Sequence, residues 1–328
     1  QKMYAMRCME YGNTLCRPLS LIINSYPRLL SPSHLHPFDL VVSRLLFSAR
    51  ERRGADGLEG VLASAKFLRK ETQARAKAAA AKAKAAPSAI IAERVYVTLL
   101  NDLNSLWENN KQRIITLRDL EKDLRRIPVL DLTIPSAVLV GSPNVGKSSL
   151  VRAISTGTPE VQDYPFTTKG MTMGHVTKSN SPADPVLCQL MDTPGLLPRA
   201  DEERNEMEML TLASIRFLPT LVVFVLDLSG LAGPKSPSTA QLSIRQELRE
   251  RFHDRPWIDI LSKADLPREA LSESDAALVP QDAISVSCTT GEGVEAFATT
   301  LEQLIGFEYT SSTELAAPAE PVQWKSQL

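Results

Sequence analysis

Residues 141–149, with the sequence Gly-Ser-Pro-Asn-Val-Gly-Lys-Ser-Ser, fit the pattern of a glycine, four residues of any type and then Gly-Lys-Ser/Thr. The apolar run at 137–140 before them is typical of a buried strand, and residues 149–154 are typical of a helix. In such a unit, backbone N–H groups and the helix N-terminus surround an anion, and the lysine reaches the outer phosphates. The sequence therefore predicts a nucleotide phosphate site at Asn144, Val145, Gly146, Lys147, Ser148 and Ser149.

Two later segments carry groups suited to Mg²⁺ and to the γ-phosphate of a nucleotide. The hydroxyl of Thr168 can close over the γ-phosphate and reach the metal ion, and its spacing from the glycine-rich loop favours it over Thr167. Asp192 follows an apolar strand and starts the sequence Asp-Thr-Pro-Gly. Its carboxylate can hold Mg²⁺ through water, and the N–H of Gly195 can contact the γ-phosphate. We therefore predict the catalytic groups Lys147, Thr168 and Gly195, and the metal-binding groups Thr168 and Asp192.

A third segment has the pattern of a base-recognition loop. After another apolar strand, the sequence Ser-Lys-Ala-Asp stands where GTPases usually carry Asn-Lys-x-Asp. Asp265 can accept hydrogen bonds from guanine N1–H and the exocyclic amine, a pair that adenine does not offer, and the stem of Lys263 can lie along the base. Ser262 lacks the asparagine amide, so we expect one weakened contact. Ser287 and Cys288 follow a further strand, and their backbone can meet guanine O6.

Two residues bear on the rate of hydrolysis. Leu196 occupies the position at which Ras-like enzymes place a glutamine to orient the attacking water, so unaided turnover should be slow. Asn144 has two roles that the sequence leaves open: it could help K⁺ to bind beside the phosphates, or it could only satisfy backbone groups of the loop.

Several short runs together resemble the Obg-related GTPases and, within them, the nucleolar GTP-binding protein (Nog) family. The main run is Tyr-Pro-Phe-Thr-Thr-Lys-Gly at 164–170, followed by Gly174 and His175. The others are Glu-Arg-Asn-Glu-Met-Glu at 203–208, Leu-Asp-Leu-Ser at 226–229, Leu-Arg-Arg-Ile-Pro at 124–128, Tyr-Pro-Arg-Leu-Leu at 26–30 and His-Pro-Phe at 36–38. The resemblance covers roughly residues 4–305 and is strongest from 124 to 230.

The resemblance implies a GTPase of large-ribosomal-subunit assembly, with a helical domain ahead of the GTP domain. It further implies that Ser148 and Thr168 are Mg²⁺ ligands, and that Lys147 and Asp265 contact phosphate and base. The chain departs from the family in two respects. Ser262 replaces the usual asparagine, and the sequence is a short form that ends soon after the GTP domain, where nuclear members carry a long extension.

Length and composition fit two ordinary domains. The 328 residues leave room for two, and 43% hydrophobic residues are enough for their cores. The longest apolar run, at 221–226, is too short to cross a bilayer, and the four histidines offer no ligand set. The cysteines show no metal-binding spacing and suggest a reducing compartment rather than disulfides; they are Cys8, Cys16, Cys188 and Cys288.

The net charge of −1 hides an uneven distribution. Residues 1–130 contain 22 Lys and Arg against 12 Asp and Glu, a balance of +10, whereas residues 131–328 contain 15 against 26, a balance of −11. This asymmetry predicts that the first part of the chain binds a polyanion and that the second part does not.

Residues 1–130 are predicted to form an all-α domain with a long helical hairpin. In the first 56 residues, short helices are expected, interrupted by Pro18, Pro27, Pro32 and Pro37. One long helix should then run from Leu58 through an Ala/Lys-rich stretch to Ala86, and a second from about Ser88 to Ile127. The two helices, separated by Pro87, should pack antiparallel.

Basic residues of the first hairpin arm are predicted to form a charged tip: Arg69, Lys70, Arg75, Lys77, Lys82 and Lys84. Three roles remain open for this surface: a solvated helix face, a surface that binds RNA phosphates, or a helix that lies on a membrane. RNA is favoured because acidic residues scarcely offset the charge. A membrane is disfavoured because the apolar stripe there is mostly alanine.

Residues 131–307 alternate between strand and helix patterns, which predicts an α/β P-loop GTPase domain with a mostly parallel sheet and helices on both faces. Ligands of such folds bind at the carboxyl ends of the strands, where all the motifs above fall. The polar segment 308–328 is predicted to be a disordered tail.

These features predict a GTP-binding and GTP-hydrolysing assembly factor for the large ribosomal subunit. Its predicted cofactors are GTP or GDP, Mg²⁺ and, through Asn144, K⁺. Its predicted partners are a large-subunit precursor, rRNA and ribosomal proteins, with no membrane and no homo-oligomer. The alternatives are a GTP-dependent RNA clamp with little hydrolysis and a GTPase of another RNA process. The non-Met start and short C-terminus favour an organelle, chloroplast before mitochondrion, over the nucleolus.

Overall fold

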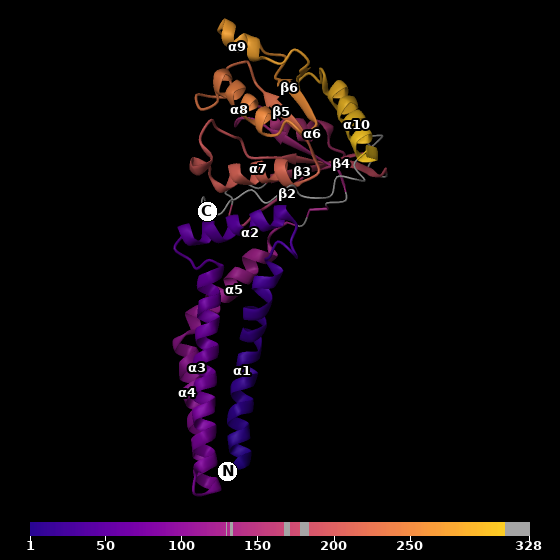
Figure 1. Ribbon diagram of the computed structural model, residues 1–328. Helices are drawn as coiled ribbons and strands as arrows, with labels where there is room; N and C mark the ends of the chain where they lie inside the picture. Colours follow the sequence, from indigo (N-terminus) through magenta and orange to yellow (C-terminus); the bar gives the residue numbers. More distant parts are fainter. Residues whose placement is uncertain (129, 132–133, 167–170, 178–183, 312–328) are drawn as a thin grey trace. The chain divides into compact units, whose positions relative to one another are not determined.

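The computed structural model describes residues 1–128, 130–131, 134–166, 171–177 and 184–311 (Figure 1). The chain divides into two compact units, Gln1–Arg126 and Ile127–Leu328. The first unit is helical, and the second is built around a β-sheet.

The helical unit contains a hairpin of two long helices. Its elements are α1 (Lys2–Leu29), α2 (Pro37–Arg52), α3 (Leu58–Ala85), α4 (Ala89–Asn109) and α5 (Lys111–Arg125). α3 and α4 run antiparallel on either side of Pro87, which confirms the predicted hairpin (Figure 1). The hydroxyl of Ser88 accepts a hydrogen bond from the N–H of Ile91 and so caps the start of α4.

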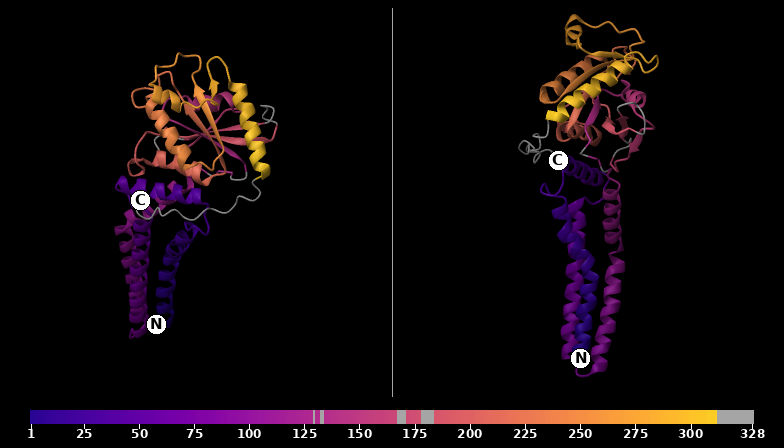
Figure 2. Two further views of the ribbon diagram at one scale, coloured as in Figure 1. Left: turned by 45° about the horizontal axis from the view of Figure 1, so that its top comes forward. Right: turned by 90° about the vertical axis from the view of Figure 1, so that its right-hand side faces the viewer.

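α1 differs from the prediction of short, proline-broken helices. It is one helix of 28 residues with Pro18 and Pro27 inside it, and it lies alongside α3 (Figure 2). An interior proline costs a helix about 3 kcal/mol, because it removes a hydrogen bond and clashes with the preceding turn. Burial offsets that cost, since α1 has an apolar stripe at helical spacing: Cys8, Cys16, Leu19 and Ile23.

Small residues allow α1 and α3 to approach closely. A Cβ atom built on Gly12 would lie under 3.0 Å from the Cβ of Ala76, closer than real Cβ atoms come. Ala76, Ala79 and Ala83 are buried, whereas the lysines of the same stretch are exposed. The Ala/Lys-rich stretch is therefore a packing surface on one side and a charged surface on the other.

The second arm of the hairpin is also interrupted. The predicted continuous helix from Ser88 to Ile127 ends at Asn109, and α5 begins at Lys111. Between them, Asn110 has φ −110° and ψ 18°, and its side-chain N–H donates to the carbonyl oxygen of Leu106 at 2.8 Å. A side-chain amide that competes for a helix carbonyl favours helix ends over helix interiors, which explains the break.

Within the described residues, the second unit has a seven-stranded sheet in the order β2-β3-β4-β1-β5-β6-β7. β4, β1, β5, β6 and β7 are parallel, whereas β2 and β3 pair antiparallel at one edge. The prediction of a mostly parallel sheet is confirmed. The strands are β1 (Ser136–Val140), β2 (Glu160–Gln162), β3 (Met171–Thr177), β4 (Val186–Asp192), β5 (Thr220–Leu226), β6 (Trp257–Ser262) and β7 (Ile284–Val286).

Helices cover both faces of this sheet, as predicted (Figure 2). Leu139 of β1 and Val223 of β5 belong to an apolar cluster on one face that includes residues of α6 and α10. On the other face, Phe224 stacks against Trp257, and Arg249 of α8 lies over the Trp257 ring. The helices are α6 (Lys147–Ile154), α7 (Glu206–Phe217), α8 (Ser238–Arg251), α9 (Glu273–Leu278) and α10 (Val294–Ser311).

The last described helix reaches into the segment for which disorder is predicted. α10 ends at Ser311, four residues into the predicted tail, and residues 312–328 lie outside the described residues. Among the described residues, no helix combines the length and hydrophobicity that a bilayer span requires.

Candidate nucleotide-binding site

The candidate site lies at the carboxyl edge of the parallel strands. The phosphate loop, residues 141–149, connects β1 to α6. Asp192, Asp227 and Ser262 lie where β4, β5 and β6 end. Because parallel strands end at the same edge of a sheet, segments that are far apart in the sequence meet here.

The phosphate loop has backbone angles that favour glycine. Gly141 has φ 149° and Gly146 has φ 99°. A Cβ atom on Gly141 would also lie under 3.0 Å from the carbonyl oxygen of Val225. Asn144 has φ 63°, which asparagine tolerates better than most residues, and its side-chain amide donates to the carbonyl oxygen of Ala232 at 3.4 Å. That contact is of the loop-bracing kind, one of the two roles that the sequence leaves open for Asn144.

Lys147 lies inside the phosphate loop. Its ammonium donates to the carbonyl oxygens of Gly141 at 3.1 Å and Ser142 at 2.8 Å, and the residue is 6% exposed. Burial lowers the pKa of Lys147 to about 8, while the carboxylate of Asp192 acts in the opposite direction. A phosphate group in the loop would favour the charged ammonium, because it adds the negative charge that carbonyl oxygens lack.

The structure brings two of the predicted metal ligands together. The hydroxyl of Ser148 donates a hydrogen bond to the carboxylate of Asp192. Burial raises the pKa of Asp192, and the hydrogen bond from Ser148 and the charge of Lys147 lower it. These two oxygen donors fit Mg²⁺, which prefers oxygen ligands and completes its shell with water and phosphate. The third predicted ligand, Thr168, lies outside the described residues, as does Thr167.

The segment after β4 lies directly on the phosphate loop. A Cβ atom on Gly195 would lie under 3.0 Å from the backbone nitrogen of Pro143. The N–H of Leu196 donates to the carbonyl oxygen of Gly141 at 3.1 Å. The Leu196 side chain is fully buried and aliphatic, and an aliphatic side chain has no polar group that could orient a water molecule in the site.

Glu208 is not among the predicted site residues, yet it anchors the segment that follows Gly195. Its carboxylate accepts hydrogen bonds from the N–H groups of Leu197 and Asn205, both at 3.1 Å, and pairs with Arg199 at 3.4 Å. The Asn205 side chain in turn caps the start of α7. The Asn-x-x-Glu spacing is that of a capping box, so this signal is present in the sequence.

The base loop, residues 262–265, lies beside the segment that follows β7. The N–H of Ala264 donates at 3.1 Å to the carbonyl oxygen of Val286, which is the residue before Ser287. Burial raises the pKa of the Cys288 thiol, the charge of Arg152 lowers it, and the charge of Asp265 raises it. Cys288 and Asp265 are thus within electrostatic reach of each other, and both are exposed. The predicted base-contacting residues therefore lie together.

Ser262 connects the base loop to the phosphate loop. Its Oγ lies 2.6 Å from the carbonyl oxygen of Val145 and 3.0 Å from that of Leu226. The Ser262 hydroxyl therefore holds the base loop against the phosphate loop. The sequence predicts one weakened contact here, because serine lacks the asparagine amide. A hydroxyl has one proton, however, so it donates to only one of the two oxygens at a time.

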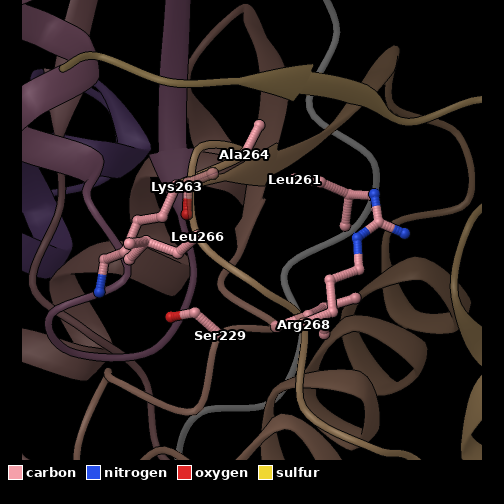
Figure 3. A pocket seen from close by; sticks show the side chains of 8 residues that line it. Ser229, Leu261, Lys263, Ala264, Leu266 and Arg268 are labelled. Carbon is pink, nitrogen blue, oxygen red and sulfur yellow. The ribbon is translucent and has the colours of Figure 1, made fainter. Parts of the chain in front are cut away.

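A small pocket lies between the base loop and the segment after β5 (Figure 3). Beside it, the ammonium of Lys263 pairs with the carboxylate of Asp227 at 2.5 Å. Asp227 is not a predicted site residue, because a single acid at the end of a strand is a weak signal. The pocket is lined by Leu228, Ser229, Leu261, Ser262, Lys263, Ala264, Leu266 and Arg268.

Two family models match the chain, one in each unit. Residues 1–131 match the NOG1 N-terminal helical domain. Residues 136–263 match the 50S ribosome-binding GTPase family.

Curated relatives match most of the chain. Nucleolar GTP-binding protein 1 of Arabidopsis thaliana is 27% identical over 282 residues, which are 85% of this chain and 40% of the relative. The protein of the same name from Encephalitozoon cuniculi is 27% identical over 300 residues, 90% of this chain and 54% of the relative. A Plasmodium falciparum crystal structure assigned to the same protein is 27% identical, covers 57% of this chain and 94% of its own, and has a TM-score of 0.46. The chain thus spans about half the length of these curated relatives or less.

Proposed function

We propose that this protein binds and hydrolyses GTP during assembly of the large ribosomal subunit. Its chain joins the helical domain of the nucleolar GTP-binding protein family to a GTPase domain. The family itself is confirmed by the two models and by the relatives that share its name. The activity and partners of the whole protein are our proposal.

The observation that carries the proposal is the meeting of Lys147, Ser148, Asp192 and Gly195 at one edge of the sheet. Lys147 would neutralise the outer phosphates. Ser148 and Asp192, with Thr168, would hold Mg²⁺, which supplies positive charge to the transferring phosphoryl group. The N–H of Gly195 would contact the γ-phosphate. Because residue 196 is a leucine, no amide at that position orients the attacking water, and unaided turnover would be slow.

The choice of guanine rests on the base loop and its neighbour after β7. Asp265 is exposed and would accept hydrogen bonds from guanine N1–H and the exocyclic amine. Ser287 and Cys288 lie beside it, and their backbone would meet O6. The match of residues 136–263 to a GTPase family supports the same base.

The proposed partner of the helical unit is rRNA. Lys77, Lys82 and Lys84 are exposed on α3, opposite the buried alanines. The side-chain amide of Gln1 donates to the carbonyl oxygen of Ala86 at 2.7 Å, so the exposed Lys2 of α1 lies at the same end of the hairpin. Clustered lysines without acidic partners are suited to a phosphate backbone.

The predicted tip needs one correction. Lys82 and Lys84 lie within a turn of the end of α3, whereas Arg69 and Lys70 lie about 23 Å back from that end along the helix. Arg75 lies between them and pairs with Glu71 at 3.8 Å. Residues that are more than about ten positions apart on a helix lie far apart along its axis, and a count of charges in the sequence does not reveal this separation. The hairpin tip is defined here as Lys77, Lys82 and Lys84, the exposed lysines in about the last 12 Å of α3.

Charge reversal of the hairpin tip tests the rRNA proposal. Lys77→Glu, Lys82→Glu and Lys84→Glu together should lower the affinity for large-subunit particles by about tenfold or more and reduce its dependence on salt. The matched control reverses three exposed charges of α5 instead: Lys111, Arg118 and Lys122. Equal losses in both variants would contradict a specific role of the tip, and intact GTP binding in both would show that the second unit is unharmed.

A GTP-dependent RNA clamp that scarcely hydrolyses is the second candidate, and the lack of a water-orienting amide at Leu196 favours it. Single-turnover GTP hydrolysis with and without large-subunit particles separates the two. Phosphate release that the particles accelerate supports the assembly GTPase, and no release in either sample supports the clamp. Crosslinking of the hairpin to RNA, followed by identification of the RNA, would reveal a GTPase of another RNA process.

The nucleolus is the location that the relatives favour, because their names place them there. The prediction of an organelle has no support from these relatives. Fluorescence microscopy of the tagged protein with nucleolar and organellar markers distinguishes the two.

A further inference from the structure

Asp227 is a buried carboxylate held from several sides. It directly follows β5 and is 0% exposed. One carboxylate oxygen accepts hydrogen bonds from the N–H and the hydroxyl of Ser229, at 2.9 and 2.6 Å, and the other pairs with Lys263 at 2.5 Å. Gln241 of α8 bonds to both the N–H and the carbonyl of Asp227, at 2.8 and 2.9 Å. Asp227 is therefore a rigid anchor.

Lys263, by contrast, depends on its surroundings for its conformation. It has φ 54°, in the left-handed region that side chains other than glycine rarely adopt. Its long stem also loses rotamer entropy when it is fixed. An ion pair with a rigid, buried partner offsets both costs. The pair also orders the stem before any ligand arrives.

Within the part of the chain that the structure describes, the base loop makes few other hydrogen bonds to the rest of the site. The Ser262 hydroxyl can donate to Val145 or to Leu226, but not to both at once. The N–H of Ala264 adds one bond to Val286. With a serine in place of the usual asparagine amide, a larger share of the positioning falls to the pair between Asp227 and Lys263.

We propose that Asp227 is a positioning residue of the base site. It holds the stem of Lys263 alongside the place where the guanine ring would lie, and it thereby fixes the position of Asp265 in the same loop. This inference rests on the proposed binding of GTP at the base loop. It concerns the base alone, because Asp227 makes none of the contacts that hold Lys147 or Ser148.

Binding of GDP and of tripolyphosphate, measured by calorimetry on the full chain, tests the proposal. Tripolyphosphate has no base, so its binding reports on the phosphate site alone. Asp227→Asn should weaken GDP binding by about tenfold, the worth of one charge-assisted hydrogen bond, and leave tripolyphosphate binding unchanged. The matched control is Asp259→Asn, which breaks another buried pair of the same unit, with Arg245 at 2.6 Å, and should alter neither affinity.

A double-mutant cycle separates positioning from a general structural effect. Lys263→Met should weaken GDP binding, and adding Asp227→Asn should cause no further loss if Asp227 acts through Lys263. Additive losses, or an equal loss of tripolyphosphate binding, would overturn the proposal. Should Asp227→Asn not fold, Ser229→Ala removes one support of the same carboxylate and should cause a smaller loss for GDP alone; unchanged GDP affinity there would also overturn it.

Measuring ADP binding to the wild-type chain as well distinguishes this inference from the proposed function. If the wild-type chain binds tripolyphosphate but binds GDP no better than ADP, guanine recognition itself is wrong. If the wild-type chain prefers GDP and Asp227→Asn retains that affinity in full, guanine recognition stands and the positioning role of Asp227 is wrong.

Discussion

Replacing Gly12 with alanine should destabilise the helical unit, although alanine is the better helix former. Gly12 lies inside α1, where alanine gains about 1 kcal/mol over glycine from helix propensity. The new Cβ atom, however, would lie under 3.0 Å from the Cβ of Ala76 on α3. A normal contact between carbon atoms needs about 3.5 Å.

The size of the effect follows from what the methyl group meets. The Cβ of Ala76 has no torsion angle that could move it aside, so α1 and α3 must separate locally. Overpacking of this kind costs about 1–3 kcal/mol. Helix propensity offsets about 1 kcal/mol of the overpacking cost. The free energy of unfolding should therefore fall by a net amount of about 1 kcal/mol.

Urea unfolding followed by the fluorescence of Trp107 measures this loss. The indole N–H of Trp107 donates to the hydroxyl of Thr72 at 3.1 Å, one turn from Ala76, so its emission reports on this interface. Trp257 and Trp324 are replaced by phenylalanine in every variant, so that Trp107 alone emits. The matched control is Asn13→Ala, on the exposed side of α1, which should raise stability by about 0.5 kcal/mol through helix propensity alone, because the new methyl group meets no neighbour.

A second substitution sharpens the test. Ala76→Gly removes the methyl group that the new alanine meets, so Gly12→Ala with Ala76→Gly should be more stable than the sum of the single effects. The reasoning would be refuted if Gly12→Ala alone raised stability by about 1 kcal/mol, because helix propensity without a clash predicts that result.

Asp265→Asn should shift preference from guanine towards xanthine nucleotides, because an amide replaces the acceptor that faces N1–H; unchanged selectivity in a competition assay would mean that the base is read elsewhere. Ser262→Asn should strengthen GTP binding by about 1 kcal/mol, because an amide can donate to the carbonyl oxygens of Val145 and Leu226 together. Calorimetry that finds equal or weaker affinity would contradict this. Turnover should rise when K⁺ replaces Na⁺, since Asn144 donates to Ala232 through its nitrogen and retains its oxygen as a ligand; equal rates would leave Asn144 with loop bracing alone.

The phosphate loop and the sheet around it could be predicted from the sequence because both depend on short-range patterns. Gly141 and Gly146 adopt positive φ angles that follow from the lack of a side chain. Lys147 and Ser148 come directly after them in the chain. The continuous apolar run of β5 indicates a strand buried on both faces, and every residue of β5 is buried.

The helical unit shows where local patterns mislead. Pro18 and Pro27 disfavour a helix by their own chemistry, yet α1 continues through both. The reason is long-range: α1 buries its apolar stripe against α3, and the lack of a side chain at Gly12 leaves room for the methyl group of Ala76. Asn110 is the opposite case, since its own side chain ends a helix that the leucine spacing predicts to be continuous.

What the sequence determined by itself is which residues could bind a nucleotide; the tertiary structure decided which of them hold one another in place. Lys263 pairs with Asp227, 36 positions away, and Ser262 contacts Val145, 117 positions away. Neither pair leaves a local signal. They meet because a parallel sheet brings the carboxyl ends of its strands to one edge, so partners from different strands become neighbours only once the sheet has formed.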